Sequence, residues 1–408
     1  MATILIFLDL DEGHSFPIFR LLKRLKARGH RVLCLGLARI GDWVRSHGFE
    51  FRAIIDDVLP KEFGRLDCFE TTYVRDGLRE LYLGPLVRGQ VLDPAIAELK
   101  PDAGVFLCNY YIESLVVFYR YRLPIVLFVP ACRTVSRQQA CEAIIDTLMN
   151  LQSGAFEMIE LLTTSGAPFK SLRELSHLLL QMPELMSFPE SFDLPGSITS
   201  SNVYYLGDGV DLERTEEPFH WNGFNTEQPL IYCALGSQNH LALDTSRRFF
   251  QKVILTATAH ADRQYIISIG KMLRATDFED VPANVTLSSW VPQLTVLARS
   301  SLMINHGGFG TVKECVLMGV PMLVFPLMPG RDMDPCAERV VFHGLGLRGD
   351  IERVSACELD SMIEQVLTDP AFRQRVKSMR ELFKQQDRLD RGVEVIEQVI
   401  AASQQRTL

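Results

Sequence analysis

The stretch from residue 301 to residue 327 most constrains the fold of this 408-residue chain. The apolar run at 301–304 has the length of a buried strand, and from Thr311 the apolar residues recur at helical spacing. Gly319, closely followed by a proline, suits the left-handed end of a helix, and 322–327 is a second apolar run. A strand, a turn, a helix and a second strand predict a parallel α/β sheet.

The turn inside this unit holds three glycines beside a histidine: His306, Gly307, Gly308 and Gly310. Unpaired N–H groups and the positive end of the helix dipole make such a helix start an anion site, and missing β-carbons let a phosphate approach closely. Glycines also occur where a chain merely turns. Here His306 supplies an extra donor, and Thr311 and the charged segment 331–334 follow, so the sequence favours a phosphate site.

Residues 290–334 carry several unlike motifs in a fixed order, namely WxPQ, HGGxGTxxE, GVPxxxxP and an acidic residue near DxxP. This order resembles the donor-sugar region of the GT-B glycosyltransferases. More closely, it resembles the inverting UDP-glucosyl and glucuronosyl transferases and the macrolide and antibiotic glycosyltransferases. The resemblance implies a nucleotide-diphosphate sugar, UDP- or dTDP-linked, as co-substrate, with no other cofactor and no metal.

The resemblance implies donor contacts from Ser237, Trp290, Val291, Gln293, His306, Gly308, Gly310, Thr311, Glu314, Asp332 and Met333. Trp290 would stack on the nucleobase, and Gln293 and Glu314 would face the ribose. His306 and the turn would hold the diphosphate beside Ser237, and Asp332 would contact the sugar. The family usually has Gln where this chain has Met333, and commonly Asn where it has Cys336, so the hexose itself is not implied.

The N-terminus predicts a second βαβ unit. Residues 3–8 and 32–37 are apolar runs, and between them lies a helix that we expect Ser15 to cap and Gly29 to end. The dinucleotide fingerprint GxGxxG is absent, and the turn offers His14 instead.

The pattern GHxxPxxxLxxxLxxxGHxV around His14 is similar to the opening of the same family, in which the first histidine is the general base. A lone histidine at a helix start is often only a cap, and His30 is interpreted as structural. A helix N-terminus disfavours protonated imidazole, so His14 would stay able to accept a proton. The family's orienting aspartate follows a strand that begins at Pro-Asp, and here Asn109 occupies that place, with Glu113 and Asp102 as weaker alternatives.

Chain length predicts two domains. We expect two doubly wound, Rossmann-like α/β domains facing each other across a cleft, as in GT-B enzymes. Residues 1–212 would form the acceptor-binding domain, 213–228 a polar linker, and 229–385 the nucleotide-sugar domain. A charged helical segment is predicted at 371–402, and residues 386–408 would pack back on the first domain.

Composition restricts the partners. A formal charge of −8 argues against nucleic acid, which requires a basic face. Nine cysteines without a CxxC pair, no signal-peptide pattern and no uncharged apolar run of membrane-spanning length predict a cytoplasmic protein with reduced thiols. A homodimer is left open.

The predicted activity is therefore inverting, metal-independent transfer of a hexose to a hydroxyl of a small, largely apolar acceptor such as a natural product, with His14 as base. Two alternatives stay open: a GT-B transferase acting on a lipid or cell-wall carrier, and a non-catalytic nucleotide-sugar-binding protein.

Overall fold

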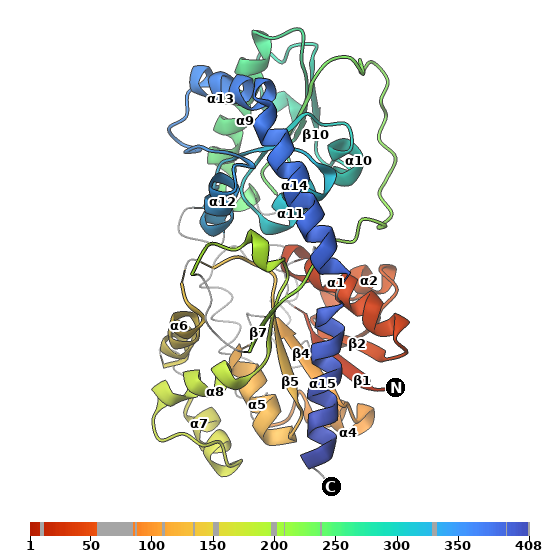
Figure 1. Cartoon of the computed structure of the whole chain (residues 1–408), viewed down its shortest axis with the longest axis vertical. Coiled ribbons are helices and arrows are strands. Elements are labelled where there is room, and N and C mark those ends of the chain that lie inside the picture. Colours follow the sequence, from red (N-terminus) through yellow and green to blue (C-terminus); the bar gives the residue numbers. More distant parts are fainter. Residues whose placement is uncertain are drawn as a thin grey trace.

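A computed structural model describes residues 1–8, 12–54, 85, 88–107, 111–133, 135–149, 155–196, 202–207, 209–236, 239–328, 333–388 and 390–406. These residues form two parallel sheets with flanking helices, one in each half of an elongated molecule (Figure 1). The predicted α/β class with two doubly wound sheets is confirmed. None of the described helices is long and apolar enough to cross a membrane.

The first sheet has the order β3-β2-β1-β4-β5-β6-β7 among the described residues, with every neighbouring pair parallel. Its strands are β1 Thr3–Phe7, β2 Arg31–Gly36, β3 Glu50–Ala53, β4 Ala103–Leu107, β5 Ile125–Val129, β6 Glu184–Met186 and β7 Val203–Tyr205. The middle strands β4 and β5 are buried along their whole length, which explains why their sequences are continuous apolar runs.

The helices of this half are α1 Glu12–Ala27, α2 Gly41–Ser46, α4 Asp93–Leu99, α5 Tyr111–Tyr121, α6 Arg137–Met149, α7 Ala155–Thr164 and α8 Leu175–Gln181. The prediction that Ser15 caps the first helix was wrong. Helix α1 begins three residues earlier, and Ser15 is fully buried inside it. A short polar side chain can equally occupy a helical position, so its presence marks a helix start only loosely.

The second sheet has the order β10-β9-β8-β11-β12-β13, again with parallel neighbours. Its strands are β8 Leu230–Ala234, β9 Gln264–Ser268, β10 Val285–Ser288, β11 Leu302–Asn305, β12 Met322–Val324 and β13 Gly346–Arg348. Its helices are α9 Leu243–Thr258, α10 Gln293–Leu297, α11 Phe309–Met318, α12 Met333–Phe342 and α13 Ala356–Thr368. Gly319 ends α11 with a φ of 78°, as the sequence predicted.

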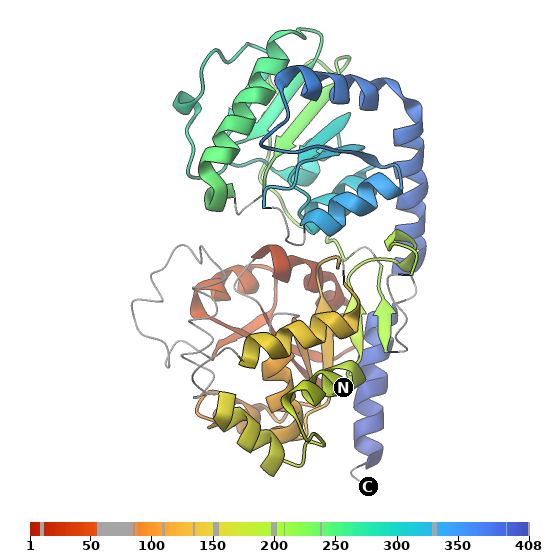
Figure 2. The same cartoon turned by 90° about the vertical axis from the view of Figure 1, so that its left-hand side faces the viewer.

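The helical segment predicted at 371–402 consists of two helices, α14 Pro370–Asp387 and α15 Arg391–Arg406. Asp390 between them has a φ of 52°, which a continuing right-handed helix does not allow. Helix α14 leaves the second half and α15 continues along the first, as the dark blue helices in Figure 2 show. Helix α15 contacts α1 and the strands β4, β5 and β7.

The two halves meet through an aromatic cluster. Phe188 and Phe192, which follow β6, pack on Phe309 of α11, with ring centroids 5.1 and 5.8 Å apart, and Phe192 also contacts Phe383 of α14. Lys313 of α11 is fully buried and donates to the carbonyl of Ser187 at 3.0 Å. The helix behind the predicted diphosphate turn is thus held directly against the first half.

Candidate active site

Two turns leave the second sheet at the point where its strand order reverses. The chain starts in the middle at β8, proceeds outward to β10, and returns to β11 on the other side of β8. In doubly wound sheets, ligands bind at the carboxyl ends of the strands beside such a reversal. Gly236 follows β8 there, and His306 follows β11.

The ring of His306 is confined between these two turns. A β-carbon on Gly236 would lie 2.4 Å from the ring, and one on Gly308 would lie 2.4 Å from its Nε2 atom. A β-carbon at either position would therefore displace the His306 ring, and Gly236 also has a φ of 80°, which favours glycine. The side chain of His306 is 9% exposed. Asn305 completes the turn by accepting the Gly307 N–H on its Oδ1 at 2.8 Å.

Helix α11 begins immediately after this ring. Its N-cap is Gly308, which has no side chain to bond the first amides, and a β-carbon on Gly310 would meet no atom within 4 Å. The first turn of the helix is therefore uncapped by its own N-cap residue and open at Gly310. N–H groups in this position bind anions, and the structure thus brings His306, Gly308 and Gly310 into one place, as predicted.

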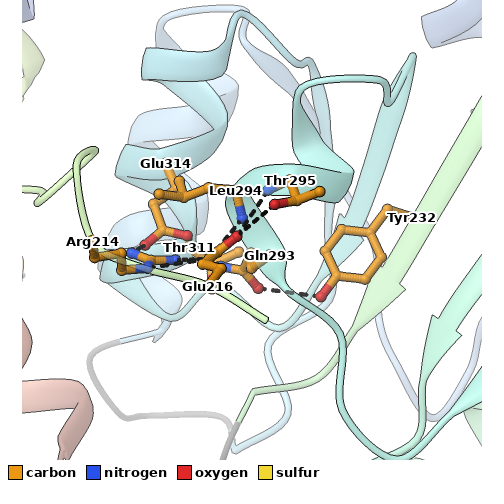
Figure 3. A network of polar contacts seen from close by, with 8 residues as sticks. All are labelled: Arg214, Glu216, Tyr232, Gln293, Leu294, Thr295, Thr311 and Glu314. Carbon is orange, nitrogen blue, oxygen red and sulfur yellow. Dashed lines mark hydrogen bonds and ion pairs between the residues drawn. The ribbon is translucent and has the colours of Figure 1, made fainter. Parts of the chain in front are cut away.

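Three other predicted donor residues form one network at the same edge of the sheet (Figure 3). Gln293, the first residue of α10, donates from Nε2 to Glu314 Oε2 at 2.6 Å and to Thr311 Oγ1 at 3.3 Å. Its Oε1 accepts from the Tyr232 hydroxyl at 3.4 Å. Burial and the nearby negative charge of Glu314 raise the pKa of Tyr232 well above its usual value, so this hydroxyl stays a donor.

Tyr232 was not identified from the sequence as part of this network, and neither were two charged residues that belong to it, Arg214 and Glu216. Arg214 donates from Nη1 to Glu314 Oε1 at 2.5 Å and from Nη2 to Glu216 at 2.9 Å. Glu216 in turn accepts the N–H groups of Leu294 and Thr295 in α10 at 3.1 and 2.9 Å. Burial opposes the charge of Arg214, but the two carboxylates outweigh it and raise its pKa.

The sequence offered little signal for this pair. Both residues lie in a polar segment that we interpreted as a linker, where charged side chains usually face solvent. The spacing of an arginine two residues before a glutamate is common and carries no information about a partner a hundred positions away.

The remaining predicted donor residues differ in exposure. Trp290 is 62% exposed, which leaves its ring free to stack, and its carbonyl accepts from Ser288 Oγ at 2.6 Å. Val291 and Met333 are buried, at 3% and 5% exposure. Met333 belongs to the apolar core of the second half, and its carbonyl lies 2.9 Å from where a Gly307 β-carbon would stand.

Ser237, Asp332 and Asn109 lie outside the described residues. His14 is the third residue of α1, and its side chain is likewise not described. Helix α1 follows the carboxyl end of β1, and β4, which precedes Asn109, pairs with β1 beside the strand-order reversal of the first sheet. Helix α1 also contacts α11. The carboxyl ends of β1 and β4 therefore lie side by side, and α1, which carries His14, lies against the helix that follows His306.

The structure distinguishes between Asp102 and Glu113, the two alternatives to Asn109 as the orienting partner of His14. The carboxylate of Asp102 accepts the Thr3 N–H at 2.8 Å at the start of β1, which is the opposite end of that strand from α1, so Asp102 is excluded as the partner of His14. Glu113 lies in the first turn of α5 and is 3% exposed. His30 bonds Glu397 of α15 at 3.1 Å, which agrees with its structural interpretation.

Residues 252–401 match the family described as erythromycin biosynthesis protein CIII-like, C-terminal domain. NDP-glycosyltransferase YjiC of Bacillus subtilis is 28% identical over 402 residues, covering 94% of both chains. Demethyllactenocin mycarosyltransferase of Streptomyces fradiae is 23% identical over 401 residues, covering 93% of this chain and 82% of its own. The crystal structure of the glycotransferase of kitacinnamycin matches with a TM-score of 0.77 at 24% identity, covering 98% of both chains, and it shows the shared fold.

Proposed function

We propose that this GT-B glycosyltransferase, similar to the macrolide and UDP-glucosyl transferases, moves a hexose from a UDP- or dTDP-linked donor to a hydroxyl of a small, largely apolar acceptor with inversion. Natural-product acceptors are supported by the family match and by the relatives' names. The single observation that carries the proposal is the placement of His306, whose ring is confined between Gly236 and Gly308 beside the open first turn of α11. The turn from His306 to Gly310 is the proposed diphosphate turn.

The donor would bind on the second half. The α and β phosphates would meet the first N–H groups of α11, close to Gly308 and Gly310, and the His306 ring. The nucleobase would stack on exposed Trp290. The ribose would face Gln293 and Glu314, which the structure joins by a hydrogen bond of 2.6 Å. Ser237, Asp332 and Met333 would complete the diphosphate and sugar contacts.

The reaction would proceed in line at the anomeric carbon. A ring nitrogen of His14 would take the proton of the acceptor hydroxyl, whose oxygen would form the new bond to that carbon. The bond from the carbon to the phosphate oxygen would break, and its electron pair would leave with the nucleoside diphosphate. That developing charge would be stabilised by the α11 N–H groups and His306, so we propose that no metal is required.

Two features support His14 in this role. It lies in the first turn of α1, where the helix dipole disfavours the protonated ring, and α1 contacts α11. Asn109 would orient the ring by accepting from its other nitrogen. The reaction would take place in the cytoplasm, in keeping with seven described cysteines that are all free thiols.

To test the proposal, the release of nucleoside diphosphate is measured from a panel of UDP- and dTDP-sugars. Each sugar is assayed both with and without a mixture of phenolic and alcoholic acceptors. We expect release that depends on both donor and acceptor. Donor binding without any acceptor-dependent release would instead favour a non-catalytic nucleotide-sugar-binding protein. Release only with lipid-linked acceptors in vesicles would favour a carrier-directed enzyme.

A further inference from the structure

Arg214 is an unusual linker residue because its side chain is only 16% exposed. The linker here crosses the carboxyl edge of the second sheet and places the guanidinium between Glu216 and Glu314, whose side chains are 14% and 9% exposed. The guanidinium also lies 5.9 Å from the ring centroid of Phe16 in α1. Figure 3 shows the guanidinium directed at the carboxylate of Glu314.

Both oxygens of Glu314 are already engaged. Oε1 accepts from Arg214 Nη1 at 2.5 Å, and Oε2 accepts from Gln293 Nε2 at 2.6 Å. A carboxylate oxygen can accept two hydrogen bonds, so a ligand hydroxyl can still be added. It would, however, be added to a carboxylate whose charge a guanidinium compensates at contact distance.

The strength of a hydrogen bond to a carboxylate depends on that charge. Hydrogen bonds to an ionised group are about twice as strong as bonds between neutral groups. A positive charge in contact with the carboxylate opposes the attraction that gives this extra strength. As long as Arg214 remains in place, the hydrogen bond from a ribose 2′-hydroxyl to Glu314 therefore adds little binding free energy. A ribose nucleotide then binds little more tightly than the 2′-deoxyribose nucleotide. The contact with Glu216 keeps it there, since Glu216 is itself fixed by two N–H groups of α10.

We propose that Arg214 is a specificity-determining positioning residue which, by compensating the charge of Glu314, lets the donor site accept ribose and 2′-deoxyribose nucleotides almost equally. The inference rests on the proposed function, because it assigns the ribose to Glu314. It goes further by naming the donor class: nucleoside diphosphates are recognised without selection at the 2′ position, so UDP- and dTDP-linked sugars both serve.

Calorimetry of UDP and dUDP binding to the full chain tests this inference, because the two ligands differ only in the 2′-hydroxyl. The wild-type protein should bind them with dissociation constants within about threefold of each other. Arg214→Met keeps the apolar stem and removes the charge, and should raise the preference for UDP to about tenfold. Arg214→Lys should restore the wild-type ratio. Arg248→Met in α9, which removes an exposed pair with Glu352, is the matched control.

The ratio of the two constants separates this role from a purely structural one. Loss of linker packing would weaken both ligands together and leave the ratio unchanged, which would overturn the inference. A wild-type preference for UDP above tenfold would overturn it without any variant. If Arg214→Met does not fold, Arg214→Gln replaces it with the same expectation. Failure of the wild-type protein to bind either nucleotide would instead overturn the proposed function, and the inference with it.

Discussion

The Nε atom of Arg339 in α12 donates to the carboxylate of Asp193 at 3.1 Å across the junction of the two halves, where the side chains are 1% and 6% exposed. Removing one partner of such a buried pair leaves an uncompensated charge and costs about 3–5 kcal/mol. We therefore expect Arg339→Met to lower the thermal midpoint strongly, as measured by calorimetric scanning.

The double variant Arg339→Met with Asp193→Asn should recover part of that loss, because no buried charge remains unpaired. Arg348→Met is the control, since its pair with Asp334 is 39% exposed on the arginine side and such pairs contribute about 0–1 kcal/mol. Equal effects of Arg339→Met and Arg348→Met would contradict a structural role for the Arg339 pair.

The diphosphate turn gives a second prediction. His306→Ala should weaken the binding of the donor and of the free nucleoside diphosphate together, because both carry the same phosphates. A charge-assisted hydrogen bond contributes roughly 1.5–3 kcal/mol, which titration calorimetry resolves. A change confined to acceptor affinity would mean that the roles of the two halves are reversed.

Alanine substitutions at two glycines of this turn test the same site by steric means. Gly308→Ala should cause a similar loss, since its methyl group would displace the His306 ring, whereas Gly310→Ala has open space and should leave the thermal midpoint unchanged or slightly raised. If a phosphate approaches Gly310 closely, this variant should lose nucleotide affinity despite its intact stability. Unaltered affinity in both variants would argue against an anion at this helix start.

The third prediction concerns the base. His14→Ala should lower the transfer rate by about 10²–10⁴ while donor affinity stays nearly unchanged, because α1 belongs to the other half of the molecule. His30→Ala, which alters a histidine bonded to Glu397, is the control and should retain the rate. Near-normal turnover of the His14 variant on an ordinary alcohol would reject the assignment.

The fourth prediction concerns Asn109. In the proposed arrangement, an amide there would fix the tautomer of His14 without adding negative charge, whereas an aspartate would stabilise the imidazolium and raise the pKa of His14. Asn109→Asp should therefore move the acidic limb of the pH–rate profile to higher pH. If Asn109 has this role, we expect the natural enzyme to have a weaker base and to favour an acidic acceptor hydroxyl such as a phenol or enol. An unmoved limb together with an inactive Glu113→Gln would identify Glu113 as the partner.

The fifth prediction is a pH dependence of stability. Burial lowers the pKa of His343, whose Nε2 bonds the Phe192 carbonyl at 3.0 Å across the junction. The unfolded chain therefore takes up the proton at a higher pH than the folded chain. The neutral ring therefore contributes its full stabilisation at a pH above the pKa of histidine in the unfolded chain, about 6.5. That stabilisation is lost as the pH falls through the lower pKa of His343 in the folded chain. The thermal midpoint should fall from pH 7 to pH 5 more steeply in the wild type than in His343→Gln, and parallel slopes would contradict this origin.

Most of the second half was predictable because its strands are continuous apolar runs separated by glycine turns. The strand predicted at 301–304 corresponds to β11 at Leu302–Asn305, and the apolar run predicted at 322–327 contains β12 at Met322–Val324. The diphosphate turn was equally visible, since each glycine performs a local task. Local pattern and fold agree there, which is the condition under which sequence arguments succeed.

What escaped prediction depends on partners distant in the chain. Arg214 is buried by Glu314, one hundred residues later, and nothing local distinguishes it from a solvated linker residue. The break at Asp390 likewise follows from the arrangement around α1. Arg24 bonds both the carbonyl and the carboxylate of Asp387, so α14 ends where this contact is made.

The return of α15 to the first sheet has a consequence for how the molecule can be made. Val393, Ile396 and Ile400 complete the same apolar cluster as Ile4 and Ile6 of β1. In topological terms the second half is an insertion within the first, between β7 and α15. A ribosome must therefore finish the second half before the first half can close its own interior. A fragment of the first half that ends at the linker would lack α15 and expose the apolar residues that this helix covers. The two halves are therefore not separable units.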